Sequence, residues 1–256
     1  MADIDPAAKA KWVLETKSVG EIPALSLKAV AESESVKYLL KPYAGGWDGV
    51  LAFKGEQRAI LVNTSIDYLP RHNFTFAHEL GHYFLEHQPS DIFDGHPAIR
   101  CTAADFESEG KIQEVQANRF AVEFLMPEER FRLDMVGAPI DFDLIKSLSK
   151  KHMVSKHACS NRILALIQSP CIVIRTAGMK ISGYMASASA KQYLKNLVNV
   201  PLGTASYAAI QNQSWQADFV RCNPAKWLEK GIAEDVLYEC TRGDRKSGTA
   251  MTILKW

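Results

Sequence analysis

Two histidines and a glutamate stand at the spacing of a metal-binding helix. The stretch FTFAHELGHYFLEH, residues 74–87, contains His78, Glu79 and His82 in the order H-E-x-x-H. Residues four apart lie on one face of an α-helix, so both imidazoles can bind a single ion. Glu79 follows His78 directly, where its carboxylate can flank the ion and take a proton from a water molecule that the ion binds. The motif therefore predicts a catalytic zinc site.

The same five-residue motif also occurs by chance on surface helices, where it would mean only two solvated histidines and a glutamate. Here the neighbours are apolar at mixed three- and four-residue spacing, as in a largely buried helix: Phe74, Phe76, Ala77, Leu80, Phe84 and Leu85. Burying a polar side chain without a partner costs about 1–3 kcal/mol, which favours the metal site. Gly81 costs the helix about 1 kcal/mol relative to Ala, as expected if another backbone crowds that side.

A catalytic zinc ion usually takes three protein ligands and leaves one position for water. In the metzincin pattern, a Gly and then a third His follow the motif. This chain has Leu85 and Gln88 at those positions, and His87 is one position off. The metzincin interpretation therefore fails.

A carboxylate from a later helix is the other source of a third ligand. The segment EVQANRFAVEFLMP, residues 114–127, has the apolar spacing of a helix and ends in a proline. Glu114 and Asn118 share one face of that helix. Glu114 could bind the ion, while Asn118 accepts the N–H of a liganding imidazole.

Other carboxylates compete with Glu114. Glu123 lies near the same helix face and is a reserve candidate. The acids upstream are more simply explained as a solvated loop and an acidic helix start, where the helix dipole favours negative charge: Asp105, Glu107 and Glu109. We favour Glu114 because of its E-x-x-A-N context.

This helix pair resembles the ImmA/IrrE family of bacterial zinc metallopeptidases. The similarity rests on FTFAHELGH, followed some thirty residues later by E-x-x-A-N-x-F-A-x-x-F-L-M-P. A preceding strand that ends in Asn63, and a helical tail V-S-x-x-A-x-x-x-R that begins at Val154, are supporting features. The resemblance extends roughly from Ile22 to Leu166. It implies one zinc ion per chain, the ligands His78, His82 and Glu114, and Glu79 as the catalytic base.

Composition is that of an ordinary soluble protein. The chain has 256 residues, 47% of them hydrophobic, and a formal net charge of +1, so no overall charge favours nucleic acid or membranes. The start MADIDPAAKAK is not expected to be a signal peptide, and no apolar stretch is long enough to span a bilayer. Five cysteines without a C-x-x-C pair suit reduced thiols, so we expect a cytoplasmic protein and no cysteine ligand.

The expected fold class is α+β, in three parts. Residues 1–135 would form a zincin-like peptidase domain, with helices at 6–16 and 26–33 and a small antiparallel or mixed sheet from strands at 36–43, 49–54 and 58–63. In zincins such a sheet has an edge strand that a substrate can extend. The connection 88–108 shows little regular pattern; it could cover the cleft, and His96 within it could touch substrate, although an exposed loop histidine is the simpler interpretation.

Residues 136–169 are predicted to form a helical hairpin, with Ser155 as the N-cap of its second helix. The hairpin resembles a helix-turn-helix and is locally basic, but no base-reading face stands out, so we favour packing on the peptidase core over DNA binding. Residues 170–256 are expected to form a separate α/β domain. Its predicted strands are 171–175, 180–185 and 251–254, its predicted helices are 193–198 and 224–230, and Trp215, Trp227 and Trp256 are expected in its core. Some family members carry a sensory, GAF-like domain in this position.

The leading hypothesis is a zinc endopeptidase, with Mn²⁺ or Fe²⁺ as alternative metals. The oxyanion donor stays open among Tyr83, His72 and Arg162. The resemblance implies a regulatory protease whose protein substrate is a DNA-binding repressor of the XRE type. The alternative is a metal-binding regulator or toxin–antitoxin component that acts by binding a partner, without proteolysis.

Overall fold

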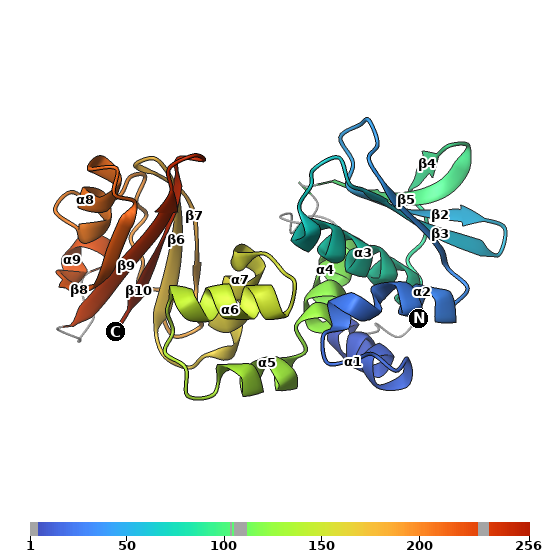
Figure 1. The fold of residues 1–256 in the computed structure, drawn as a ribbon, viewed down its shortest axis with the longest axis horizontal. Coiled ribbons are helices and arrows are strands. Elements are labelled where there is room, and N and C mark those ends of the chain that lie inside the picture. Colours follow the sequence, from blue (N-terminus) through green and yellow to red (C-terminus); the bar gives the residue numbers. More distant parts are fainter. Residues whose placement is uncertain (1–4, 103, 105–111, 230–235) are drawn as a thin grey trace. The chain divides into compact units, whose positions relative to one another are not determined.

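The computed structural model describes residues 5–102, 104, 112–229 and 236–256 (Figure 1). The chain is α+β and divides into two compact units, Met1–Ala138 with Lys146–Ala158, and Pro139–Ile145 with Cys159–Trp256. The hairpin helices α6 (Phe142–Lys151) and α7 (Lys156–Leu166) contribute residues to both units. Ser155 caps α7, as predicted, because its Oγ accepts a hydrogen bond from the backbone N–H of Ala158. The domain boundaries at 135 and 169 stay predictions.

In the first unit, one long helix is packed on both sides. The helices are α1 (Pro6–Thr16), the 3₁₀ turn η1 (Pro23–Ser26), α2 (Leu27–Ser33), α3 (Leu69–Phe84), α4 (Ile112–Leu125) and α5 (Glu128–Met135). The expected helix at 6–16 is confirmed, and the one expected at 26–33 is α2. Helix α3 contacts strands β2 and β3 on one side and α4 on the other, while α1 packs on α4 (Figure 1). The rings of Phe84, Phe120 and Phe124 stack between α3 and α4.

The sheet of this unit is mixed. Its strands are β1 (Lys37–Lys41), β2 (Gly49–Lys54), β3 (Gln57–Asn63), β4 (Asp91–Phe93) and β5 (His96–Cys101), in the order β1-β3-β2-β5-β4. Strand β1 runs parallel to β3, and the other neighbours are antiparallel. Asn63 ends β3 because its amide bonds to the chain on both sides, accepting from the N–H of Tyr43 and donating to the carbonyl of Trp47.

The connection expected to lack regular structure contains a β-hairpin. Strands β4 and β5 pair across Asp94-Gly95, and both of these residues have positive φ, at 49° and 74°. Asp-Gly is a strong signal for such a two-residue turn, and the prediction passed over it because the surrounding prolines and acids resemble a loop. Residues 103 and 105–111 of this connection, including Asp105, Glu107 and Glu109, lie outside the described part of the chain.

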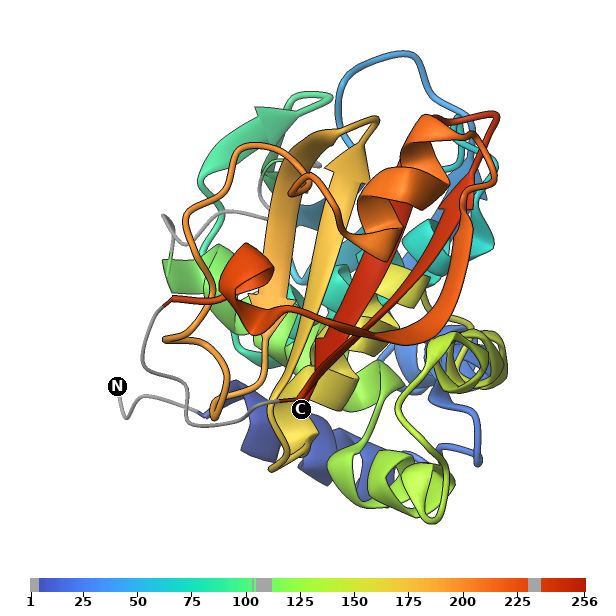
Figure 2. The ribbon, with the colours of Figure 1, turned by 90° about the vertical axis from the view of Figure 1, so that its left-hand side faces the viewer.

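The second unit is built on an antiparallel sheet (Figure 2). Its strands are β6 (Cys171–Ala177), β7 (Lys180–Ala186), β8 (Gln216–Cys222), β9 (Leu237–Asp244) and β10 (Thr249–Lys255), in the order β7-β6-β10-β9-β8. Two short helices, α8 (Ala205–Gln211) and α9 (Pro224–Trp227), pack on one face. The three strands expected from the sequence correspond to β6, β7 and β10. Trp227 is fully buried in the core, and Trp215 and Trp256 pack against it half-buried.

The prediction of a helix at residues 193–198 in this unit is wrong. Residues 193–198 contain no helix, and Leu194 instead forms a β-bridge with Leu228. The backbone groups of Tyr193 and Lys195 bond to Glu229 and Trp227, so tertiary pairing outweighs local helix propensity. The expected helix at 224–230 forms only as the single turn α9, and Lys230 lies outside the described residues.

Candidate metal centre

Helix α3 brings His78 and His82 together on its α4 side. Their Nε2 atoms lie 2.9 Å apart, and both side chains are fully buried. The i, i+4 spacing stacks the two imidazoles on successive turns, as the sequence predicts. Pro70, in the first turn, favours the start of the helix because its missing N–H would have no partner there.

Helix α4 supplies the third side chain of the group. Glu114 is buried, and its Oε2 lies 3.1 Å from Nε2 of His78 and 3.5 Å from Nε2 of His82. Gly81 lets the two helices approach, since a Cβ there would lie 3.1 Å from both Cα and the carbonyl oxygen of Ala117. This contact explains the glycine between the histidines, at a position where helix propensity alone disfavours it.

Hydrogen bonds on the far side of His78 fix where its proton lies. Nδ1 of His78 is 2.9 Å from Oδ1 of Asn118, and a carboxamide oxygen can only accept, so the proton is on Nδ1. The lone pair of a neutral His78 is therefore on Nε2, facing His82 and Glu114. Asn118 thus makes the contact expected of it.

A second chain of contacts does the same for His82. Its Nδ1 is 2.8 Å from Nδ1 of His87, whose Nε2 is 3.1 Å from Oε1 of Gln116. Because the amide oxygen accepts from Nε2 of His87, Nδ1 of His87 accepts from His82, and the His82 lone pair is on Nε2. Glu86, at φ 57°, turns the chain so that His87 returns beneath the helix end. The sequence pointed to His87 only as a histidine one position off the metzincin pattern, and no local signal indicated Gln116.

The three inward-facing atoms fit a metal ion. A tetrahedral ion with bonds of 2.0–2.1 Å separates its ligands by about 3.3 Å. The three separations here are 2.9, 3.1 and 3.5 Å. Two lone pairs and a carboxylate that converge in a buried space require a cation or a proton among them. His78, His82 and Glu114 are therefore a group able to hold a metal.

The acid–base properties of this group suit a cation. Burial, reinforced by the neighbouring imidazoles, lowers the pKa of His82 to about 4, so its ring is neutral at pH 7. Burial alone would raise the pKa of the Glu114 carboxyl, but the adjacent His78 and His82 rings outweigh it and hold that pKa below its usual value. Neutral imidazole and ionised carboxylate are the forms that bind metals.

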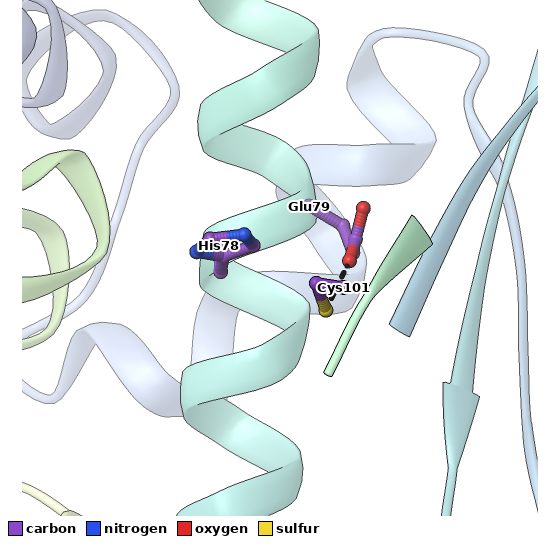
Figure 3. A group of neighbouring side chains, drawn as sticks. All are labelled: His78, Glu79 and Cys101. Atoms are coloured by element: carbon purple, nitrogen blue, oxygen red, sulfur yellow. Dashed lines mark hydrogen bonds between the residues drawn. The ribbon is translucent and has the colours of Figure 1, made fainter. Parts of the chain in front are cut away.

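Glu79 points to the other side of α3, toward the sheet. It is fully buried, and its Oε1 accepts a hydrogen bond from Sγ of Cys101 at 2.9 Å (Figure 3). Burial is the main reason why the pKa of Glu79 is well above its usual value, and nearby Glu114 adds to it. Oε2 of Glu79 has no hydrogen-bond partner in the described part of the chain. His78, Glu79 and Cys101 form a second group of potential ligands, although no cysteine ligand was expected from the sequence.

The reserve candidates have other partners. Glu123 is buried, and its Oε1 accepts from the backbone N–H of Glu128 at the start of α5. The hydroxyl of Tyr83 donates to Glu34, and Nε2 of His72 bonds to the carbonyl of Ile66. Arg162 belongs to the second unit. Among the described residues, neither these side chains nor His96 belongs to a potential metal group.

A cavity of about 710 Å³ reaches the centre from the α1 side of the first unit. His82 and His87 form part of its wall, together with Trp12, Phe53, Lys54 and Arg58. His96 also lines it.

Fold and site together define a protein with a buried H-E-x-x-H motif whose side chains can hold a metal ion. Residues 35–164, half of the chain, match the family model described as the IrrE N-terminal-like domain of peptidase family M78, and the chain belongs to this ImmA/IrrE metallopeptidase family. Among solved structures, a Mycobacterium tuberculosis transcriptional regulator has a similar fold, with a TM-score of 0.56 and 13% sequence identity over 98% of this chain and 75% of that one. No curated protein matches the sequence significantly. None of the described helices is both long and apolar enough to cross a bilayer.

Proposed function

We propose that this protein is a zinc-dependent endopeptidase. The observation that carries the proposal is the pairing of two unlike sites on one helix, a metal group on the α4 side and a carboxylate with an unpartnered oxygen on the sheet side. A zinc ion held by His78, His82 and Glu114 would lower the pKa of a water molecule and polarise a peptide carbonyl. Glu79 would take the proton of the attacking water and return it to the leaving amine.

The edge of the sheet beside Glu79 supports a peptide substrate. Strand β4 pairs with β5 only from His96 to Ala98. Among the described residues, no strand pairs with the outer side of β5 from Ile99 to Cys101, next to the Glu79 carboxylate. An extended peptide could add there by main-chain hydrogen bonds and bring its backbone close to the Glu79 carboxylate.

The proposed substrate is a transcriptional repressor of the XRE type, cleaved in the cytoplasm. Membership of the family supports this substrate. The protein would then act as a regulatory protease. The second unit would then be a sensory, GAF-like domain. The hairpin is proposed as structural, because Lys151 is held by Asp134 at 2.6 Å and α7 buries Arg162 instead of presenting it.

An alternative is a metal-binding regulator or toxin–antitoxin component that acts by binding a partner. The observation in its favour is that His78, His82, Glu79 and Glu114 are all buried. Such a centre could stabilise the fold without meeting a substrate.

One experiment separates the two functions. Purified protein is incubated with a candidate XRE-type repressor, with zinc and with a chelator, and the fragments are identified by mass spectrometry. We expect cleavage that the chelator stops. Glu79→Gln should reduce it at least about 100-fold while zinc stays bound. If the repressor stays intact with the zinc-loaded protein, or if Glu79→Gln cleaves as well as wild type, the peptidase proposal is wrong.

A further inference from the structure

The contact between Cys101 and Glu79 lies outside the metal triangle. Both side chains are fully buried, and the Cys101 sulfhydryl points at Oε1 of the Glu79 carboxylate (Figure 3). They come from different elements, Cys101 from the last position of β5 and Glu79 from the middle of α3. The thiol is thus the group by which the sheet holds this carboxylate.

The backbone at Gly49 leaves just enough room for the Glu79 carboxylate in its present position. Gly49, the first residue of β2, pairs with Cys101 in the sheet. A Cβ on Gly49 would overlap Oε1 of Glu79 and would lie 2.6 Å from Cγ2 of Thr75 and 3.0 Å from Sγ of Cys101. A larger residue at 49 would therefore push the carboxylate away from its present place. Oε1 is enclosed by the ends of two strands, while Oε2 has no hydrogen-bond partner among the described residues.

The environment of Cys101 makes the thiol a donor. Burial and the adjacent Glu79 raise the pKa of Cys101 well above its usual value, so the proton stays on sulfur. Reactive cysteines are exposed and have a lowered pKa, which excludes a nucleophilic role for this one. Within the described residues, Cys101 forms no potential metal group with His82 and Glu114, so it is not placed as a fourth ligand of the triangle.

We propose that Cys101 is a positioning residue for Glu79. Its S–H group holds Oε1 and leaves Oε2 as the one carboxylate oxygen free to exchange a proton with water. The proposal rests on the proposed function, in which Glu79 is the catalytic base. It adds that Cys101 determines which oxygen of Glu79 exchanges the proton.

The hydrogen bond can be tested without substrate or metal, by infrared spectroscopy of the S–H stretch. The difference between wild type and Cys101→Ser isolates the Cys101 band from those of the other four cysteines. The same difference is then taken in a Glu79→Gln background, where an amide oxygen replaces the stronger carboxylate acceptor. We expect the Cys101 band to move to higher wavenumber, and the band of the buried Cys159 to stay in place. A Cys101 band that does not move would overturn the contact.

The positioning role of Cys101 is tested by measuring kcat and KM for cleavage of the repressor. Cys101→Ala should lower kcat about 10-fold, equivalent to about 1.4 kcal/mol, with KM and zinc affinity unchanged, because the carboxylate loses the contact that fixes its orientation. Cys101→Ser keeps a donor and should recover most of the loss, and Cys159→Ser is the matched control. A Cys101→Ala protein that is folded by circular dichroism and has wild-type kcat would overturn the proposal, as would loss of kcat in Cys101→Ser equal to that in Cys101→Ala.

Failure of the proposed function gives a different result. In that case wild-type protein leaves the repressor intact, and so does every cysteine variant. The infrared shift then still decides whether Cys101 binds Glu79, because it needs neither turnover nor zinc.

Discussion

The two sides of α3 place polar groups in the protein interior in different ways. On the α4 side, Asn118 and His87 hold the Nδ1 protons of His78 and His82, so both Nε2 lone pairs face each other and an oxygen of Glu114. On the sheet side, Glu79 has one oxygen bound by Cys101 and one without a partner in the described chain. Converging lone pairs and a negative charge can hold a cation, whereas a carboxylate with one oxygen left without a partner can exchange a proton. The predictions below test whether the two sides act separately.

The largest expected effect is on the metal side. Glu114→Ala removes the only carboxylate of the triangle and should weaken zinc binding by more than about 100-fold, since even residues behind the ligands contribute 10–100-fold. Competition with a chromophoric chelator measures the affinity. Glu123→Gln, on the same helix, keeps an oxygen to accept from Glu128 and should bind zinc as wild type does. Equal losses in the two variants would mean that the triangle is not the site.

In metal-free protein, the two sides should depend on pH in opposite directions. His82, with its pKa lowered to about 4, contributes stability that is complete above its unfolded pKa near 6.5 and is lost as the pH falls between the two values, by at most about 3 kcal/mol. Glu114, with its pKa below the usual value, also loses its contribution in acid. Glu79 has a raised pKa, so its contribution is complete below about 4.5 and is lost as the pH rises.

Urea midpoints from pH 4 to pH 8 test this difference. Relative to wild type, Glu79→Gln should gain stability as the pH rises, and His82→Gln should gain stability as the pH falls. Parallel curves for the two variants would show that the sides are coupled.

A smaller effect is expected from His87. His87→Ala removes the acceptor that holds the His82 proton and should weaken zinc binding about 10- to 100-fold, while the carboxylate side is unchanged. The same chelator competition measures it, and His96→Ala, which lines the same cavity, is the control. Zinc affinity that is equal in His87→Ala and wild type would show that the tautomer of His82 is set without this contact.

The sequence predicted those helices and strands whose own residues have a clear pattern. Helices α1, α3 and α4 have apolar residues at helical spacing with clear start or stop residues, and their existence was expected from the sequence. The β4–β5 hairpin was missed although its Asp-Gly turn is a local signal, because the surrounding prolines and acids resemble a loop. The segment 193–198 was wrongly predicted as a helix, because its structure depends on a bridge between Leu194 and Leu228, which is distant in the sequence. Strands β8, at the edge of the sheet, and β9, next to it, were also missed, because residues favour a strand through packing against neighbouring strands more than through an intrinsic preference.

The sequence by itself determined the side chains of the metal group, because H-E-x-x-H on a helix fixes the relation of His78, Glu79 and His82 through the helical repeat alone. It also indicated Glu114 and Asn118, one turn apart on a second helix. Only the tertiary structure decided what surrounds them. Three contacts depend on how the elements pack: His87 with His82, Cys101 with Glu79, and Gly49 with both Glu79 and Cys101. No local periodicity in the sequence predicts them.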